Sequence, residues 1–129
     1  MAATRRVTIT SGSVQRSATL NASTTADAIW QALPLEGRAN RWGDEIYFST
    51  AVSLALEPAH ASEVVPAGAL GYWPPGNAFC LFWGRTPASR GDEIRAASAV
   101  TVFGQVDDDP QAFGAVRSGA QVRIEQAEE

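Results

Sequence analysis

The sequence predicts a mainly β protein whose strands close, or nearly close, into a barrel with a helix over one mouth. Eight or nine short strand patterns occur along 129 residues, against one convincing helix. An aromatic hairpin pattern runs from Gly71 to Gly84 around a Pro-Pro-Gly-Asn turn. Both alternating sets of its second arm are largely apolar. That arm is therefore buried on both faces, or has one face in the core and the other lining a pocket.

Length and composition indicate one globular domain, of a size that buries roughly two thirds of its unfolded surface. Hydrophobic residues make up 45% of the chain and charged residues 19%, as in soluble proteins. The net charge of −4 and the scattered arginines predict no binding to nucleic acid or membranes. We expect a cytoplasmic location, because neither a signal peptide nor an apolar run of membrane-spanning length is found.

Several chemistries are excluded by residues that the chain lacks. All ten basic residues are arginine, which excludes a Schiff-base lysine and a P-loop lysine. One cysteine, Cys80, allows no intrachain disulfide and no cysteine-based zinc site. Its apolar surroundings in the sequence predict a buried structural thiol. We therefore predict no metal and no cofactor.

The first strands are predicted at Val7–Thr10 and Ser13–Leu20, joined by a turn at Ser11-Gly12. A two-residue turn there would place Arg16 on the same face as apolar residues. Two alternatives follow: a bulge changes the register, which we favour, or Arg16 lines a polar pocket.

One amphipathic helix follows. Thr24 is the predicted N-cap, with Asp27 in the first turn, and Pro34 ends the helix. The spacing i, i+3, i+4, i+7 predicts one apolar stripe, formed by Ala26, Ile29, Trp30 and Leu33.

The rest of the chain predicts further strands joined by turns and loops. The second hairpin has Leu35–Asn40 and Glu45–Thr50 around Gly43, with Ile46 and Phe48 on one face and Tyr47 and Ser49 on the other. A strand at Val52–Glu57 and a loop at Pro58–Ser62, which carries the single histidine, come next. The central hairpin pairs Ala69–Trp73 with Ala78–Trp83, and Gly76 takes a positive φ at its turn. A polar loop at Arg85–Glu93, a strand at Ser98–Val106, a helical turn from Asp109 to Phe113 and a strand at Gln121–Gln126 complete the chain.

Two segments carry a resemblance to a known family. They are residues 33–49, with Gly-Arg-Ala-Asn-Arg-Trp-Gly-Asp, and residues 71–89, which begin Gly-Tyr-Trp-Pro-Pro-Gly. With Ala97–Val100 and Gly104–Val106, they resemble the small prokaryotic cyclophilin-like proteins over about residues 5–126. The resemblance implies an eight-stranded cyclophilin-like β-barrel covered by helices, in a family without an established function. The Phe-His-Arg motif of true cyclophilins has no counterpart here, so no isomerase residue carries over.

We expect the protein to bind a small molecule or peptide segment in a pocket lined by aromatics and arginine, with a homodimer as a possible assembly. One alternative is weak prolyl isomerisation, in which Arg38 or Arg85 would stabilise the twisted amide. Another is an accessory subunit of an amide-hydrolysing assembly, as occurs for related domains. The plain alternative is that Arg38 and Arg85 are surface residues and that the aromatic residues Tyr72, Trp73 and Phe82 belong to the core. The candidate ligand-binding residues are Arg38, Arg41, Trp42, Asp44, Tyr47, Tyr72, Trp73, Phe82 and Arg85.

Two arrangements of catalytic residues have little support. A Ser-His-Asp triad would need His60, which stands in a Pro/Ala loop. The adjacent acids Asp44 and Glu45 do not form a dyad, because neighbouring residues of a strand point to opposite faces. Asp44 is better interpreted as a turn residue beside Gly43.

Overall fold

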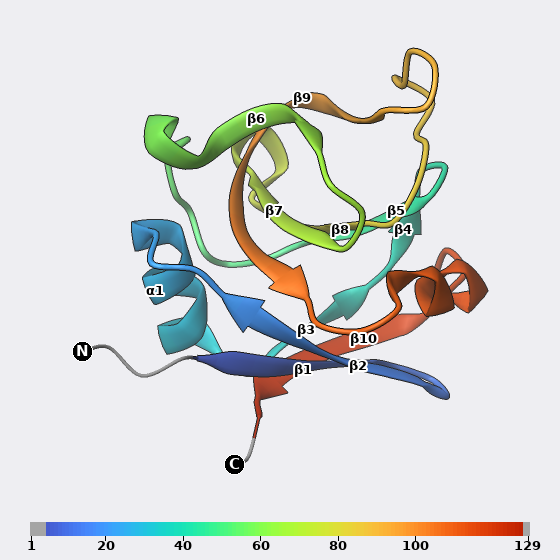
Figure 1. Ribbon diagram of the computed structural model, residues 1–129. Coiled ribbons are helices and arrows are strands. Elements are labelled where there is room, and N and C mark those ends of the chain that lie inside the picture. Colours follow the sequence, from blue (N-terminus) through green and yellow to red (C-terminus); the bar gives the residue numbers. More distant parts are fainter. Residues whose placement is uncertain (1–4, 128–129) are drawn as a thin grey trace.

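The computed structural model describes residues 5–127 and has a mainly β fold with one α-helix (Figure 1). The helix is α1 (Thr24–Ala32), and the three short 3-10 turns are η1 (Pro58–His60), η2 (Pro74–Gly76) and η3 (Pro110–Ala115). The strands are β1 (Arg6–Ser11), β2 (Val14–Leu20), β3 (Leu35–Arg38), β4 (Asn40–Arg41), β5 (Glu45–Ser49), β6 (Ala61–Val65), β7 (Ala69–Trp73), β8 (Ala78–Phe82), β9 (Ile94–Val106) and β10 (Gln121–Gln126).

The strands form one antiparallel sheet in the order β3-β10-β1-β2-β9-β7-β8-β5-β4, with β6 paired to β9. The expected closed eight-stranded barrel is not confirmed, because no strand pairing within residues 5–127 joins β3 to β4. These two end strands follow each other in the chain and are separated by Ala39, whose N–H donates to the carbonyl of Ala120 (2.8 Å). The chain changes partner at this residue, from β10 to β5, so the sheet is strongly curved but open.

The predicted helix is present as α1 and covers one side of the main core, whereas the closed barrel whose mouth it was expected to cover is not confirmed. Ala26 and Ile29 are fully buried, and Trp30 packs partly buried against the core. The N-cap is Ser23, one residue before the predicted Thr24, because the Ser23 hydroxyl accepts from the Ala26 N–H (3.0 Å). The Glu57 carboxylate completes the cap by accepting from the N–H groups of Thr24 and Thr25. No helix within the described residues is both long and apolar enough to span a membrane.

The first hairpin turns one residue later than predicted, at Gly12-Ser13, because Ser11 pairs with Val14. Arg16 then lies opposite Ile9, so it does share a face with apolar residues. Neither predicted alternative occurs: the guanidinium extends outward and its Nε donates to the carbonyl of Asp109 (2.9 Å). Asp109 is also the N-cap of η3, as predicted, and accepts from the Gln111 N–H.

The predicted strand at Val52–Glu57 is wrong. Side chains, rather than a neighbouring strand, bind this backbone: the Tyr72 hydroxyl accepts from the Leu54 N–H, and the Thr101 hydroxyl accepts from the Glu57 N–H (both 3.0 Å). The strand occurs later, as β6, which pairs with β9.

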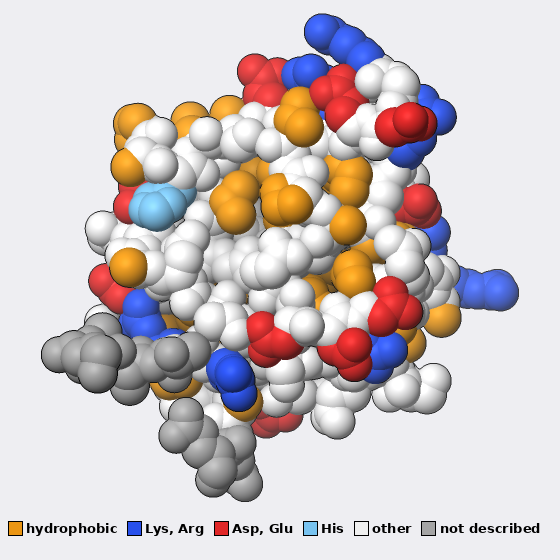
Figure 2. Space-filling view, viewed as in Figure 1, with side chains coloured by type: hydrophobic (Ala, Val, Ile, Leu, Met, Phe, Trp, Pro, Cys, Tyr) orange, Lys and Arg blue, Asp and Glu red, His pale blue; other side chains and the backbone are white. Residues whose placement is uncertain are grey.

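Strand β8 is buried along its whole length, as predicted from its two apolar faces. Phe79 and Leu81 pack into the main core with α1, β1 and β10. The opposite face packs beneath β6 and the first half of β9, which pass over the β7–β8 hairpin (Figure 1). Figure 2 shows hydrophobic side chains gathered on this part of the surface. The second cluster consists of Val65, Ala69, Ala78, Cys80, Phe82, Ala96 and Val100.

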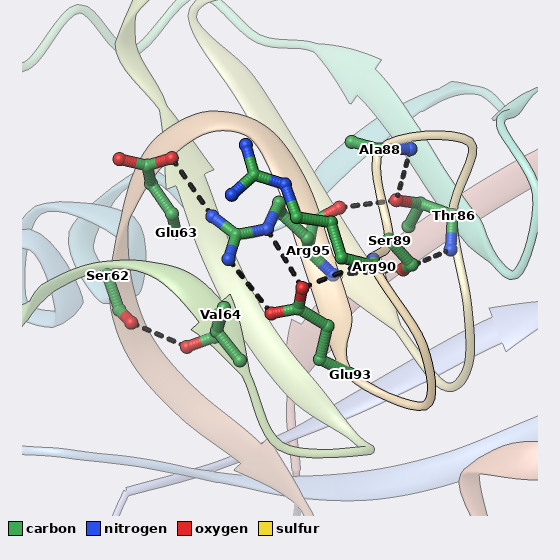
Figure 3. A network of polar contacts seen from close by, with 9 residues as sticks. All are labelled: Ser62, Glu63, Val64, Thr86, Ala88, Ser89, Arg90, Glu93 and Arg95. Carbon is green, nitrogen blue, oxygen red and sulfur yellow. Dashed lines mark hydrogen bonds and ion pairs between the residues drawn. The ribbon is translucent and has the colours of Figure 1, made fainter.

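Glycine allows the close packing of this second cluster. A Cβ on Gly71 would lie 2.9 Å from Cγ2 of Val100, so β7 must lack a side chain where β9 crosses it. An ion-pair network fixes the start of β9 beside it (Figure 3). The Arg95 guanidinium donates to Glu93 (2.9 Å) and contacts Glu63 of β6 (3.3 Å). The predicted polar loop that ends at Glu93 is thereby tied to the strands beneath it.

Candidate functional site

The site is built on the face of β5 and β8 that points away from the main core. Ile46 and Phe48 of β5 enter the main core, so their neighbours Glu45 and Tyr47 share the opposite face. The register sets Glu45 opposite Phe82 and Tyr47 opposite Cys80. A carboxyl group is thus carried by the sheet into a largely apolar environment, where the Glu45 residue is only 5% exposed.

A cavity of about 240 Å³ lies beside this carboxyl group. We call it the Glu45 pocket. It is lined by residues from β5, the turn before it, β7, β8 and the start of β9: Trp42, Glu45, Tyr47, Trp73, Cys80 and Ala97. The three aromatic residues are each partly exposed. The pocket therefore combines aromatic walls with one buried ionisable group.

The Trp73 wall is held in place by its neighbours. Its indole Nε1 donates to the Ser98 hydroxyl of β9 (2.7 Å). A Cβ on Gly76 would lie 3.0 Å from two atoms of the indole ring, so the absence of a side chain lets the turn pack against it. The predicted positive φ at Gly76 is wrong: the 3-10 turn continues through Gly76, and Asn77 takes the left-handed conformation (φ 48°).

Burial changes the acid–base properties of the pocket. Loss of hydration raises the pKa of Glu45 from 4.5 to about 7, although a hydrogen bond with the Cys80 side chain opposes this shift. Burial, with the carboxyl group nearby, also raises the pKa of the Cys80 thiol well above its usual value. Cys80 is therefore an unreactive thiol, in keeping with its predicted structural role, whereas Glu45 changes charge near neutral pH.

The structure brings together three of the predicted site residues, Trp42, Tyr47 and Trp73. Two others are core. Tyr72 is fully buried, and its hydroxyl donates to the Val52 carbonyl (2.6 Å) and accepts from Leu54. Phe82 is fully buried in the second cluster.

The predicted arginines lie outside the Glu45 pocket. Arg41 stacks over the Trp83 ring (4.9 Å), donates to the carbonyls of Gly114 and Val116, and pairs with Asp44 (3.2 Å). Arg38 is exposed and donates to the carbonyl of Gly119, and Arg85 is exposed on the polar loop. Arg41 thus connects η3 to the β4–β5 turn. Asp44 lies in this turn, as predicted.

The sequence did not predict Glu45, Cys80 and Ala97 as lining residues. A signal for Glu45 was present: it stands two residues before Tyr47, and strand alternation puts the two side chains on one face. That shared face was overlooked because Glu45 was considered only as the acid adjacent to Asp44. Within residues 5–127, no cluster of three or more His, Cys, Asp or Glu residues has the arrangement of a metal site.

Comparison with known proteins agrees with this fold. The model of a family described as cyclophilin-like matches residues 5–125. The chain belongs to the cyclophilin-like family. It is also similar to a hypothetical protein of Archaeoglobus fulgidus with a solution structure, at 39% identity and a TM-score of 0.80, over 98% of both chains. No functionally curated protein matches the chain.

Proposed function

We propose that this cyclophilin-like protein binds a small molecule or a short peptide segment in the Glu45 pocket. The observation that carries the proposal is the pocket itself: three partly exposed aromatic residues around one buried carboxyl group. Ligand sites are typically concave and apolar, with a few directed polar groups. If these three aromatic residues were only part of the core, their rings would fill the cavity that they now line.

The size of the pocket limits the ligand. At about 240 Å³ it is smaller than the cavities that hold drug-sized molecules, which begin at about 300 Å³. A compact molecule or a single side chain of a peptide fits this range. The lining comes from four separate strands and a turn, so the site depends on the folded sheet rather than on one mobile loop.

A fragment screen by NMR, with neutral, anionic and cationic compounds, tests the proposal. We expect at least one class to shift the indole signals of Trp42 and Trp73. Ala97→Phe should block binding, because its ring would occupy the pocket from an exposed position on β9. The control Ala55→Phe changes an exposed residue that does not line the pocket. Binding that persists in Ala97→Phe, or a screen without hits in any class, would contradict the proposal.

Prolyl isomerisation has less support, because the arginine that would assist it does not line the pocket. A protease-coupled assay with a proline peptide decides this alternative. We expect no catalysis above background at high protein concentration. Catalysis that is lost in Arg38→Ala or Arg85→Ala would instead restore the isomerase and its predicted arginine.

A further inference from the structure

The Glu45 pocket also indicates which chemical class binds, an inference that rests on the proposed function. Among residues 5–127, Glu45 is the one acid that is buried, and no arginine or histidine of these residues forms an ion pair with it. Other partly buried acids have such partners: Glu93 pairs with Arg95, and Glu57 binds the helix N-terminus and lies near His60. A buried carboxylate without a cation is costly, so a positive charge bound in the pocket would be favoured over an empty pocket once Glu45 is ionised.

The walls of the pocket favour the same charge. The faces of tryptophan and tyrosine rings carry negative electrostatic potential and attract ammonium groups that have lost water. Trp42, Tyr47 and Trp73 supply three such rings, and Glu45 supplies a formal negative charge among them. Sites that combine aromatic walls with an acid recognise alkylated ammonium groups in particular, because methyl groups fit the rings and weaken hydration.

We propose that the Glu45 pocket binds an organic ammonium group, carried either by a small free cation or by an alkylated lysine side chain of a peptide. The compact pocket suits a headgroup of this size and excludes most larger ligands. An anion would meet the Glu45 carboxylate and no arginine.

The groups around Glu45 predict a dependence on pH. Cys80 and Tyr47 face it from β8 and β5, and burial keeps the Cys80 thiol neutral by raising its pKa. Asp44 next to it is paired with Arg41, which stacks on Trp83 of the main core. Because burial raises the pKa of Glu45 to about 7, the acid must lose its proton when the cation binds below that pH. Affinity should fall about tenfold for each pH unit below 7 and level off above it.

Titration calorimetry and NMR with choline at pH 8 test this proposal, with the uncharged carbon analogue 3,3-dimethyl-1-butanol as a probe of identical shape. We expect choline to bind at least tenfold more tightly than the analogue. Glu45→Gln should remove that preference, and Glu36→Gln, an exposed acid away from the pocket, should retain it. A trimethyllysine peptide and its unmodified counterpart identify the source: tighter binding of the methylated peptide than of choline indicates a side chain, and the reverse a free cation.

Two results would overturn the assignment in distinguishable ways. Equal affinity for choline and its uncharged analogue, or an unchanged preference in Glu45→Gln, refutes the ammonium site while the pocket still binds ligands. If neither these probes nor any fragment binds, the proposed function fails as well. Because loss of affinity in Glu45→Gln could reflect a disturbed fold, Ala97→Phe serves as a second variant that keeps the acid and must also abolish choline binding.

Discussion

The two faces of β8 lie in different environments. On one face, Phe79 stacks on Phe48 and meets Phe103 edge-on, with ring centroids 5.4 Å apart in both pairs. On the other face, Cys80 lines the Glu45 pocket beside a carboxyl group that has no cationic partner among the described residues. One face is closed and apolar, and the other retains space and an ionisable group. The first contributes stability, and the second keeps a buried acid at a cost in stability.

The largest effect should come from the closed face. Phe79→Ala removes a ring that contacts two other aromatic rings in the main core. We expect the free energy of unfolding to fall by about 3–5 kcal/mol in chemical denaturation, because the core cannot refill the cavity. A loss below about 1 kcal/mol would show that this face packs less tightly than described.

On the pocket face, by contrast, replacing the ionisable side chain should increase stability. Because the pKa of Glu45 is about 7 in the fold and near 4.5 when exposed, ionisation costs stability as pH rises from 4.5 to 7. Glu45→Gln should therefore stabilise the protein by up to about 3 kcal/mol at pH 8 and have little effect at pH 4. Thermal denaturation across this pH range measures the difference.

A second glutamate provides a matched control of opposite sign. Hydrogen bonds from the N–H groups of Thr25 and Thr24 lower the pKa of Glu57. The stability that ionised Glu57 contributes is present above pH 4.5 and is lost as the pH falls through the lowered pKa that Glu57 has in the folded protein. Glu57→Gln should therefore destabilise the protein at neutral pH and have a smaller effect in acid. If both variants shift stability in the same direction at pH 8, the assignment of the two environments is wrong.

The two tyrosines should differ in how much their hydroxyl groups contribute to stability. Tyr72→Phe leaves the partly buried Leu54 N–H and Val52 carbonyl without their partner, so we expect the free energy of unfolding to fall by about 1–3 kcal/mol. Hydrogen exchange at the Leu54 amide should accelerate. Tyr47→Phe, on the pocket side, should change stability by less than about 0.5 kcal/mol. Equal losses for both variants would contradict the distinction.

A small and local effect should come from the turn behind Trp73. An added methyl group in Gly76→Ala lies 3.0 Å from the indole, which must shift by a few tenths of an ångström. We expect a change in the Trp73 indole signal by NMR with a loss of stability below about 1 kcal/mol. Pro75→Ala, at an exposed position of the same turn, is the control. Identical indole signals in Gly76→Ala and the native protein would show that this contact does not position the wall.

The sequence predicts those elements whose side chains alternate in a regular way. The two strands of the central hairpin, the last strand and the N-cap at Asp109 are confirmed because the local pattern is clear there, although the predicted turn at Gly76 is not. The segment Val52–Glu57 alternates equally well but is bound by the side chains of Tyr72 and Thr101, which no local pattern reveals. Strand β6 has a weak pattern of its own and forms through its pairing with β9.

Only the aromatic part of the site was predicted, because it follows from which hairpins are neighbours. Trp42, Tyr47 and Trp73 are large aromatic residues on two neighbouring hairpins, and the pairing of β5 with β8 and β8 with β7 brings them together. The arginines were expected beside them, but backbone carbonyls of the last third of the chain bind Arg38 and Arg41 instead. Such long-range contacts have no signature in the local sequence.

A pH titration of the Glu45 side-chain carboxyl carbon by NMR, assigned with Glu45→Gln, measures whether this acid is buried without a cation. We expect a midpoint near pH 7 in the free protein, which moves to lower pH when choline is added. A midpoint near 4.5, unaffected by choline, would mean that the carboxyl group is hydrated, and the Glu45 pocket would then lose the property on which its proposed chemistry depends.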